Sequence, residues 1–137
     1  MDAARKHSHK RDAILSCLRS TIVHPTAEWV YRQLKPEIPD LSLGTVYRNL
    51  AMFKQTGEVQ SLGTVDGLER FDADTAPHAH FICVRCNAVL DAPGIALPAT
   101  VLNDVGAVTG GRVSGCQLLF FGECSDCLKE KEIKNFK

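Results

Sequence analysis

Apolar residues near the N-terminus recur at the spacing of a helix that buries one face. Between residues 9 and 20, the apolar side consists of Ile14, Leu15 and Leu18. Cys17 lies beside them and is interpreted as a small core residue. The pattern therefore predicts an amphipathic helix that packs against later parts of the chain.

A second and a third helix are indicated by capping residues as well as by apolar spacing. Pro25 ends the first helix, and the hydroxyl of Thr26 can cap a second helix over residues 27–35. Ser42 can cap a third helix over residues 43–55. The side chains expected to be buried are Val30, Tyr31 and Leu34 in the second helix, and Leu43, Val46, Leu50 and Phe53 in the third.

The opposite face of the third helix is polar and carries an arginine, which is typical of a helix-turn-helix whose recognition helix reads the major groove. A plain helical bundle with a solvated face explains the three helices equally well. In the DNA-binding interpretation Tyr47 and Arg48 contact base edges, and Arg48 best matches guanine O6 and N7. The residues expected to hold phosphates or cap helices are Ser42, Thr45, Asn49, Arg19 and Lys54.

Two β-prone runs after the helices favour the DNA-binding interpretation. Residues 58–65 and 68–72 are joined by Asp66 and Gly67, a pair favoured in two-residue type I′ turns. Three helices followed by such a hairpin make a winged helix. A linker is expected over residues 73–77, where the character of the sequence changes.

The patterns on the two sides of this linker predict two domains and an α+β fold class. We assign residues 1–74 to a winged helix-turn-helix DNA-binding domain and residues 75–137 to a small α/β dimerisation domain. The second domain is expected to contain strands at 78–84, 88–92 and 112–121, a helix at 97–106 that buries Leu97, Val101, Leu102 and Val105, and a C-terminal helix capped by Ser125.

The last of these strands ends in apolar residues, 118–121, that fall on both of its faces. A strand with two apolar faces needs cover on both. So small a domain cannot supply that cover alone, and we therefore expect a homodimer with this domain as its interface.

Composition narrows the environment of the protein. Sixteen basic and sixteen acidic residues balance in a chain of 137. The first 54 residues nevertheless hold an excess of basic side chains, which is compatible with phosphate contact. Because no apolar run approaches the ~20 residues of a membrane span and the N-terminus is too polar for a secretion signal, we expect a cytoplasmic protein without a membrane partner.

Two Cys-x-x-Cys pairs indicate a metal site made of sulfur. Cys83 and Cys86 form the first pair, and Cys124 and Cys127 form the second. Two such pairs are typical of a closed tetrahedral zinc site. Two disulfides or surface thiols are the alternatives, but disulfides do not suit a reducing compartment. We predict a structural zinc ion.

A second set of metal-capable side chains offers nitrogen and oxygen. His78 and His80 fall on one face of the expected strand, together with Ile82, whereas Cys83 falls on the other face. The histidines and the first cysteine therefore cannot easily serve one ion. Asp91 follows shortly afterwards, and a separate site is expected.

Jointly, several short motifs resemble the ferric uptake regulator family over nearly the whole chain. They are His24-Pro25-Thr26-Ala27, Thr45-Val46-Tyr47-Arg48-Asn49-Leu50, Arg70-Phe71-Asp72, His78-Ala79-His80, the two Cys-x-x-Cys pairs and Val108-Thr109-Gly110. The resemblance implies a dimeric, metal-dependent transcription repressor that binds a double-stranded DNA operator and is not an enzyme.

Within the family, the chain is most similar to the peroxide-sensing branch. In that branch three histidines and two aspartates hold the regulatory Fe(II) or Mn(II), and the matching positions are His24, Asp72, His78, His80 and Asp91. The resemblance implies that His24 and His78 are oxidised when peroxide meets bound Fe(II), after which DNA is released. Peroxide would then be the only small-molecule substrate.

Other interpretations of these motifs stay open. A regulator of iron, manganese or zinc uptake would share the fold without peroxide chemistry. Two histidines and a carboxylate also form the facial triad of mononuclear iron oxygenases, and a zinc-knuckle interaction module would not bind DNA. His24 itself could be a capping or core histidine beside Pro25.

A few positions depart from the family pattern. Ala79 stands where the iron-uptake branch has an acid, so a further metal site is expected to be missing. Cys116 is interpreted as a core residue, with a redox thiol as the alternative. Asn87 replaces a common glycine and can keep the knuckle because asparagine tolerates positive φ. The N-terminus is shorter than usual, which bears on DNA affinity.

Overall fold

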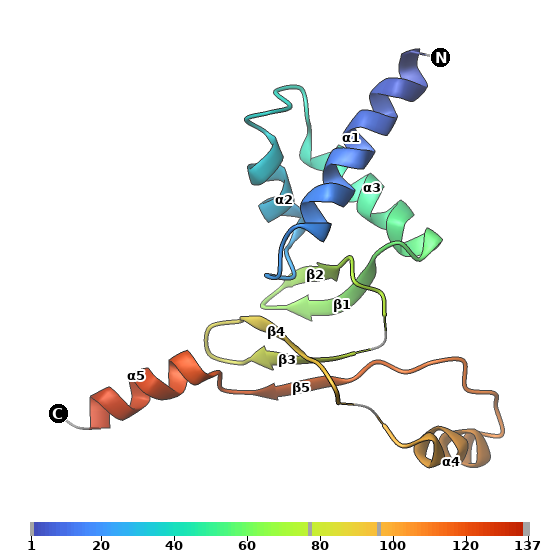
Figure 1. The fold of residues 1–137 in the computed structure, drawn as a ribbon, viewed down its shortest axis with the longest axis vertical. Helices are drawn as coiled ribbons and strands as arrows, with labels where there is room; N and C mark the ends of the chain where they lie inside the picture. Colours follow the sequence, from blue (N-terminus) through green and yellow to red (C-terminus); the bar gives the residue numbers. More distant parts are fainter. Residues whose placement is uncertain (1, 77, 96, 136–137) are drawn as a thin grey trace. The chain divides into compact units, whose positions relative to one another are not determined.

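The computed structural model describes residues 2–76, 78–95 and 97–135. The chain divides into two compact units, Met1–Ala76 and Pro77–Lys137, and Figure 1 shows the elements of each. The boundary expected from the sequence lies slightly earlier, after Asp74. The assignment of DNA binding to the first unit and of dimerisation to the second stays a prediction.

The N-terminal unit consists of three helices followed by a two-stranded hairpin, the order of a winged helix-turn-helix. Its elements are α1 (Asp2–Arg19), α2 (Ala27–Leu34), α3 (Leu43–Thr56), β1 (Gln60–Val65) and β2 (Leu68–Asp72). The first helix begins earlier than its apolar pattern predicted, because its first turns carry no apolar stripe that could reveal them.

Both predicted caps of the N-terminal unit are confirmed. The Thr26 hydroxyl accepts a hydrogen bond from the backbone N–H of Trp29 at 3.1 Å, and the Ser42 hydroxyl accepts one from Thr45 at 3.1 Å. The core between the helices and the hairpin contains all the predicted α3 positions, although Leu43 and, in α2, Tyr31 are only partly buried. The buried cluster is Ile14, Leu15, Leu18, Ala27, Val30, Leu34, Ile38, Leu41, Val46, Leu50, Phe53, Val59 and Phe71.

The predicted hairpin turn is also confirmed. Strands β1 and β2 pair antiparallel, and Val65 lies opposite Leu68. The two residues between them, Asp66 and Gly67, have φ values of 53° and 81°, as a type I′ turn requires. The wing is therefore specified by a local signal.

The C-terminal unit is a three-stranded sheet with two helices. Its elements are β3 (Ala79–Cys83), β4 (Val89–Ala92), α4 (Ala99–Thr109), β5 (Leu119–Gly122) and α5 (Ser125–Asn135). The strand order is β4-β3-β5, with β4 antiparallel and β5 parallel to β3 (Figure 1). Helix α5 begins at Ser125 itself, so the prediction that Ser125 is its cap was off by one position.

Two predictions for this unit are wrong for the single chain. Residues 112–118 are irregular, and only Leu119–Gly122 form the predicted third strand. Helix α4 has no buried residue among those described, and Leu97, Val101 and Val105 are 38%, 36% and 45% exposed. Both patterns presuppose a neighbour, and the described part of this chain does not cover these side chains.

The apolar end of β5 is uncovered as well. Phe120 and Phe121 are 46% and 65% exposed.

Among the described residues, no helix combines the length and the apolar character that crossing a bilayer demands.

Candidate functional site

The four cysteines of the two Cys-x-x-Cys pairs converge in the C-terminal unit. Their sulfur atoms all lie within 4.8 Å of one another. The Sγ atoms of Cys83 and Cys127 are 3.7 Å apart, and those of Cys86 and Cys124 are also 3.7 Å apart. Four sulfurs bound tetrahedrally at about 2.3 Å from zinc would be separated by about 3.8 Å, whereas a disulfide requires about 2.05 Å. The cluster therefore fits structural zinc.

Chain turns bring these sulfurs together. Cys83 ends β3, and the turn toward β4 carries Cys86 and then Asn87, whose φ of 64° confirms that asparagine supplies the positive value. The backbone N–H groups of Cys86 and Cys124 point at the Cys83 sulfur from 3.5 and 3.4 Å. Cys127 lies in the first turn of α5. Cys124 lies in the two-residue segment between β5 and α5, so the knuckle is built from a strand end, a turn, this segment and a helix start.

The thiols of Cys83 and Cys127 differ in acidity. The backbone N–H groups of Cys86 and Cys124 lower the pKa of Cys83 to about 6. The hydrogen bond with the Cys124 thiol, followed by burial and the other sulfurs, raises the pKa of Cys127 to about 12. Thiolates crowded together repel one another, so a divalent cation is needed to hold all four deprotonated, and its binding releases protons.

In the N-terminal unit, His24 and Asp72 lie side by side. His24 Nε2 is 3.3 Å from Asp72 Oδ2, and the side chains are only 4% and 11% exposed. The other oxygen of Asp72 accepts a hydrogen bond from the backbone N–H of Asp74 at 2.8 Å. Ligand atoms that share an ion at about 2.1 Å are about 3 Å apart, so this pair can hold a metal.

In the C-terminal unit, His78, His80 and Asp91 converge. The register of β3 and β4 places His80 opposite Asp91. Asp91 Oδ1 lies 3.0 Å from His78 Nε2 and 3.3 Å from His80 Nε2, and the two imidazole centroids are 4.2 Å apart. Two imidazoles and one carboxylate suit Fe(II), Mn(II) or Zn(II).

Most residues predicted to face DNA lie on α3, with Ser42 at its N-cap and Arg19 at the end of α1, but several of them also bond within the protein. The Tyr47 hydroxyl donates to the Glu28 carboxylate of α2, which raises the pKa of Tyr47. Arg48 Nη2 donates to Thr45 Oγ1 at 3.1 Å, and Asn49 Nδ2 donates to the Thr45 carbonyl at 2.8 Å. Their part in DNA binding stays a prediction.

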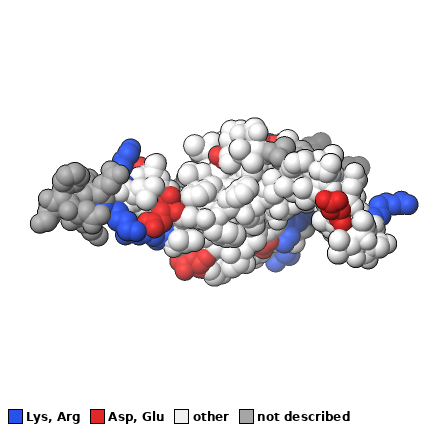
Figure 2. Space-filling model, turned by 90° about the horizontal axis from the view of Figure 1, so that it is seen from below, with Lys and Arg blue, Asp and Glu red and all other residues white. Residues whose placement is uncertain are grey.

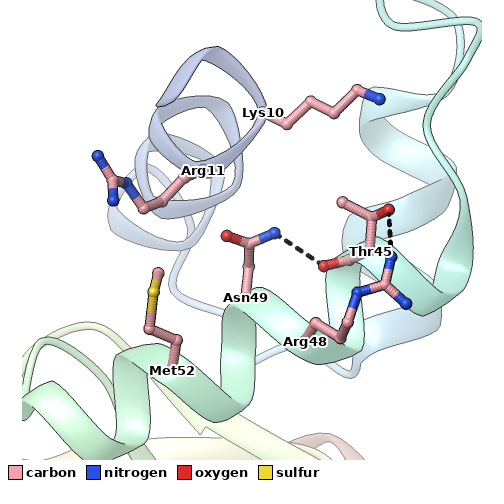
Figure 3. A pocket seen from close by; sticks show the side chains of 6 residues that line it. All are labelled: Lys10, Arg11, Thr45, Arg48, Asn49 and Met52. Carbon is pink, nitrogen blue, oxygen red and sulfur yellow. Dashed lines mark hydrogen bonds between the residues drawn. The ribbon is translucent and has the colours of Figure 1, made fainter. Parts of the chain in front are cut away.

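A hollow of about 310 Å³ lies between α1 and α3 (Figure 3), and the sequence did not predict that Lys10, Arg11 and Met52 line it. Asn49 projects from α3 toward α1, which carries Lys10 and Arg11. The basic excess of the first 54 residues was the signal for these two side chains. The lining residues are Lys10, Arg11, Thr45, Arg48, Asn49 and Met52.

Charge is mixed on one face of the protein. On the face shown in Figure 2, most of the surface is uncharged, and basic side chains lie close to acidic ones. Even Lys10 has an acidic partner, because its Nζ is 3.1 Å from Asp40 Oδ2. Electrostatic attraction to phosphate would therefore have to be local.

The two remaining cysteines have different surroundings. Cys17 is partly buried against the N-terminal core, as predicted, and burial raises the pKa of its thiol. Cys116 is exposed within the irregular segment 112–118. The prediction that Cys116 is a core residue is wrong for the single chain, because the strand that would have buried it does not form there.

The chain is similar to known proteins in both sequence and structure. The profile described as the ferric uptake regulator family matches residues 2–95. The peroxide operon regulator of Bacillus subtilis is 37% identical over 124 residues, which are 89% of this chain and 83% of that protein. The peroxide-responsive repressor PerR of Staphylococcus aureus is 34% identical over 122 residues, which are 86% of this chain and 79% of that protein.

Solved structures share the fold. The Campylobacter jejuni peroxide stress regulator matches with a TM-score of 0.78 at 23% identity, over 92% of this chain and 94% of that one. The Helicobacter pylori ferric uptake regulator matches with a TM-score of 0.72 at 20% identity, over 88% and 80% of the two chains. At these identities the similarity supports the architecture alone.

Proposed function

Since this chain belongs to the ferric uptake regulator family, we propose that it is a metal-dependent DNA-binding repressor that senses hydrogen peroxide. Family members are transcription regulators rather than enzymes, and they bind DNA as dimers. The observation that carries the peroxide assignment is 37% identity to a peroxide operon regulator over 89% of the chain. We place the protein in the cytoplasm.

One regulatory ion is proposed to use both sets of nitrogen and oxygen donors. The N-terminal unit offers His24 and Asp72, and the C-terminal unit offers His78, His80 and Asp91. Each set alone leaves a transition metal incompletely coordinated. An ion that takes ligands from both would fix the DNA-binding unit relative to the rest, which gives the two states that allosteric control requires.

Bound Fe(II) supplies a one-electron reductant that converts hydrogen peroxide into a strong local oxidant, whereas Mn(II) does so poorly. His24 and His78 are the proposed targets, and each imidazole lies beside a carboxylate, Asp72 and Asp91 respectively. An oxidised imidazole is a weaker donor. Its unit would then lose its hold on the shared site, and the DNA-binding units would lose their fixed spacing.

The zinc cluster has a different role in this proposal. Its four cysteines keep the C-terminal unit folded and take no part in sensing. Helix α4 exposes apolar side chains, and so does β5 at Phe120 and Phe121. Because apolar surface of this kind is normally covered, it supports a homodimer formed through this unit.

Helix α3 is the proposed recognition helix, and α1 is proposed to contact the DNA backbone beside it. Arg48 would read guanine, and Arg11 at the hollow would contact a phosphate. Replacing Arg48 with alanine is expected to cost about 1 to 3 kcal/mol of binding free energy at one base position.

Replacing Arg11 with alanine is expected to weaken binding to every DNA sequence by the same factor. It should also lower by about one the slope of log affinity against log salt concentration.

Fluorescence anisotropy with a selected duplex, its single-base variants and several salt concentrations would measure both effects. Lys131→Ala is the control, because Lys131 pairs with Glu123 in the C-terminal unit. An equal loss on every duplex for the Arg48 variant would reassign Arg48 to the backbone. An unchanged salt slope for the Arg11 variant would remove α1 from the interface.

The decisive experiment for the function is peptide mass spectrometry. The zinc-containing protein is loaded with Fe(II) without oxygen and treated with hydrogen peroxide, with a Mn(II)-loaded sample as the control. We expect one added oxygen atom on His24 or His78 in the iron sample only, together with release of DNA. His9, outside the proposed site, should stay unmodified. Metal-dependent DNA binding without histidine oxidation would instead establish a metal-uptake regulator.

A further inference from the structure

The loop that carries His24 is held by two consecutive residues of β2. Arg70 donates through Nε to the His24 carbonyl and through Nη2 to the Val23 carbonyl, the latter at 2.7 Å. The backbone N–H of Phe71 donates to the Pro25 carbonyl at 3.0 Å. Three consecutive carbonyl groups of the loop are therefore fixed to the wing.

The backbone of His24 explains why such support is needed. Its φ of 53° lies in the left-handed region, which residues other than glycine rarely adopt. A conformation of this kind persists only where the surroundings impose it. The side chain of His24 is also buried, with only 4% of it exposed. The Arg70 guanidinium presents several N–H groups in a rigid plane and can hold two adjacent carbonyls at once.

We propose that Arg70 is a positioning residue for the regulatory metal, because it holds the His24 backbone so that Nε2 is aimed at the Asp72 carboxylate. The proposal rests on the proposed function, in which His24 and Asp72 are ligands. Arg70 and Asp72 are two positions apart in β2 and therefore share one face of the strand. One strand thus supplies a ligand and also supports the loop that supplies the other.

Electrostatics and positioning predict opposite effects for this arginine. The Arg70 guanidinium is a cation that is hydrogen-bonded to the backbone of His24, a proposed metal ligand. Its charge would repel a bound metal cation. If charge were its only influence, its removal would tighten metal binding. If Arg70 positions His24, its removal must weaken metal binding. The sign of the change therefore separates the two.

The test measures the Mn(II) dissociation constant of the full-length, zinc-loaded protein. For Arg70→Ala we expect binding to be ten- to a hundredfold weaker, the usual effect of losing a group that orients a ligand. Arg70→Lys keeps the charge but not the planar fork, so an intermediate loss is expected, and this variant decides the question if the alanine variant does not fold. Lys35→Ala, which removes a cation that donates to the carbonyls of Pro39 and Leu41 in the same unit, should leave the affinity unchanged.

A double-mutant cycle with His24→Ala distinguishes positioning from general loosening of the fold. If Arg70 acts through His24, then adding Arg70→Ala to His24→Ala should cause little further loss of Mn(II) affinity. The positioning role of Arg70 would be overturned if Arg70→Ala weakened Mn(II) binding equally with and without His24→Ala. It would also be overturned if Arg70→Ala by itself left Mn(II) binding unchanged or made it tighter. In both cases the proposed function would stand. If His24→Ala itself leaves Mn(II) binding intact, the ligand assignment of the proposed function fails instead.

Discussion

Removal of zinc is expected to unfold the C-terminal unit while the N-terminal unit stays folded. Binding of zinc to such a site is worth about 10 to 16 kcal/mol, as much as the whole stability of a typical domain, about 5 to 15 kcal/mol. Few side chains of the C-terminal unit are buried among the residues that the structure describes, and three of them are cysteines of the zinc cluster. They are Ala79, His80, Ile82, Cys83, Val89, Cys124 and Cys127.

The N-terminal unit differs because its helices and wing share a large apolar core. Fully buried residues such as Ile14, Val30 and Phe53 come from separate helices, and none of this core depends on a metal ligand. Loss of zinc removes no contact from it. The two units should therefore respond differently to the same treatment.

Hydrogen exchange measured by mass spectrometry resolves the two units in one sample. Treatment with a strong zinc chelator, or the substitution Cys127→Ser, should abolish protection in β3, β4 and β5 and leave α1 to α3 protected. Cys116→Ser is the matched control, because this exposed cysteine lies outside the cluster. Retained protection of β3 after complete removal of zinc would show that the sheet folds without the ion.

Local signals were enough to predict most of the N-terminal unit. The caps at Thr26 and Ser42 and the turn at Asp66 and Gly67 each depend on bonds within a few residues. Such signals can be read from a short stretch because all of the interacting groups lie within it. The winged-helix order followed from them.

The wrong predictions concern segments whose structure depends on a neighbour. Residues 112–118 were expected to continue β5, and the apolar side of α4 was expected to be buried. An apolar pattern shows that a side chain needs cover but does not show which chain provides it. Cys116 lies in the same irregular segment, and its exposure has the same cause.

The metal sites divide in the same way. The spacing of the paired cysteines predicted the zinc cluster. The two-residue period of a strand predicted that His78 and His80 share one face. His24 and Asp72 lie far apart along the chain, so only the family resemblance placed them among the ligands. The support that Arg70 gives to His24 depends on a hydrogen bond between the wing and a loop before α2, and no short stretch of sequence reveals such a contact.

Loss of a ligand from either unit is expected to abolish the metal-dependent gain in DNA affinity. If one ion takes ligands from both units, Asp72→Asn and Asp91→Asn should each have nearly the full effect, because neither remaining set suffices. Shifting a repressor from almost fully open to almost fully closed requires about 5.5 kcal/mol, a factor of roughly 10⁴ in affinity. Each variant should reduce this gain to less than about tenfold.

Titration of DNA binding with Mn(II), combined with a count of Mn(II) bound per chain, measures both parts of this prediction. Asp66→Asn is the matched control, since it makes the same change at the hairpin turn, where asparagine is equally suited to positive φ. Two separate ions would give a different result. Each variant would then lose one bound Mn(II) and keep the other, and the gain in DNA affinity would fall by only part of its value. Equal and nearly complete losses in both variants, without loss of zinc, are therefore what one shared ion requires.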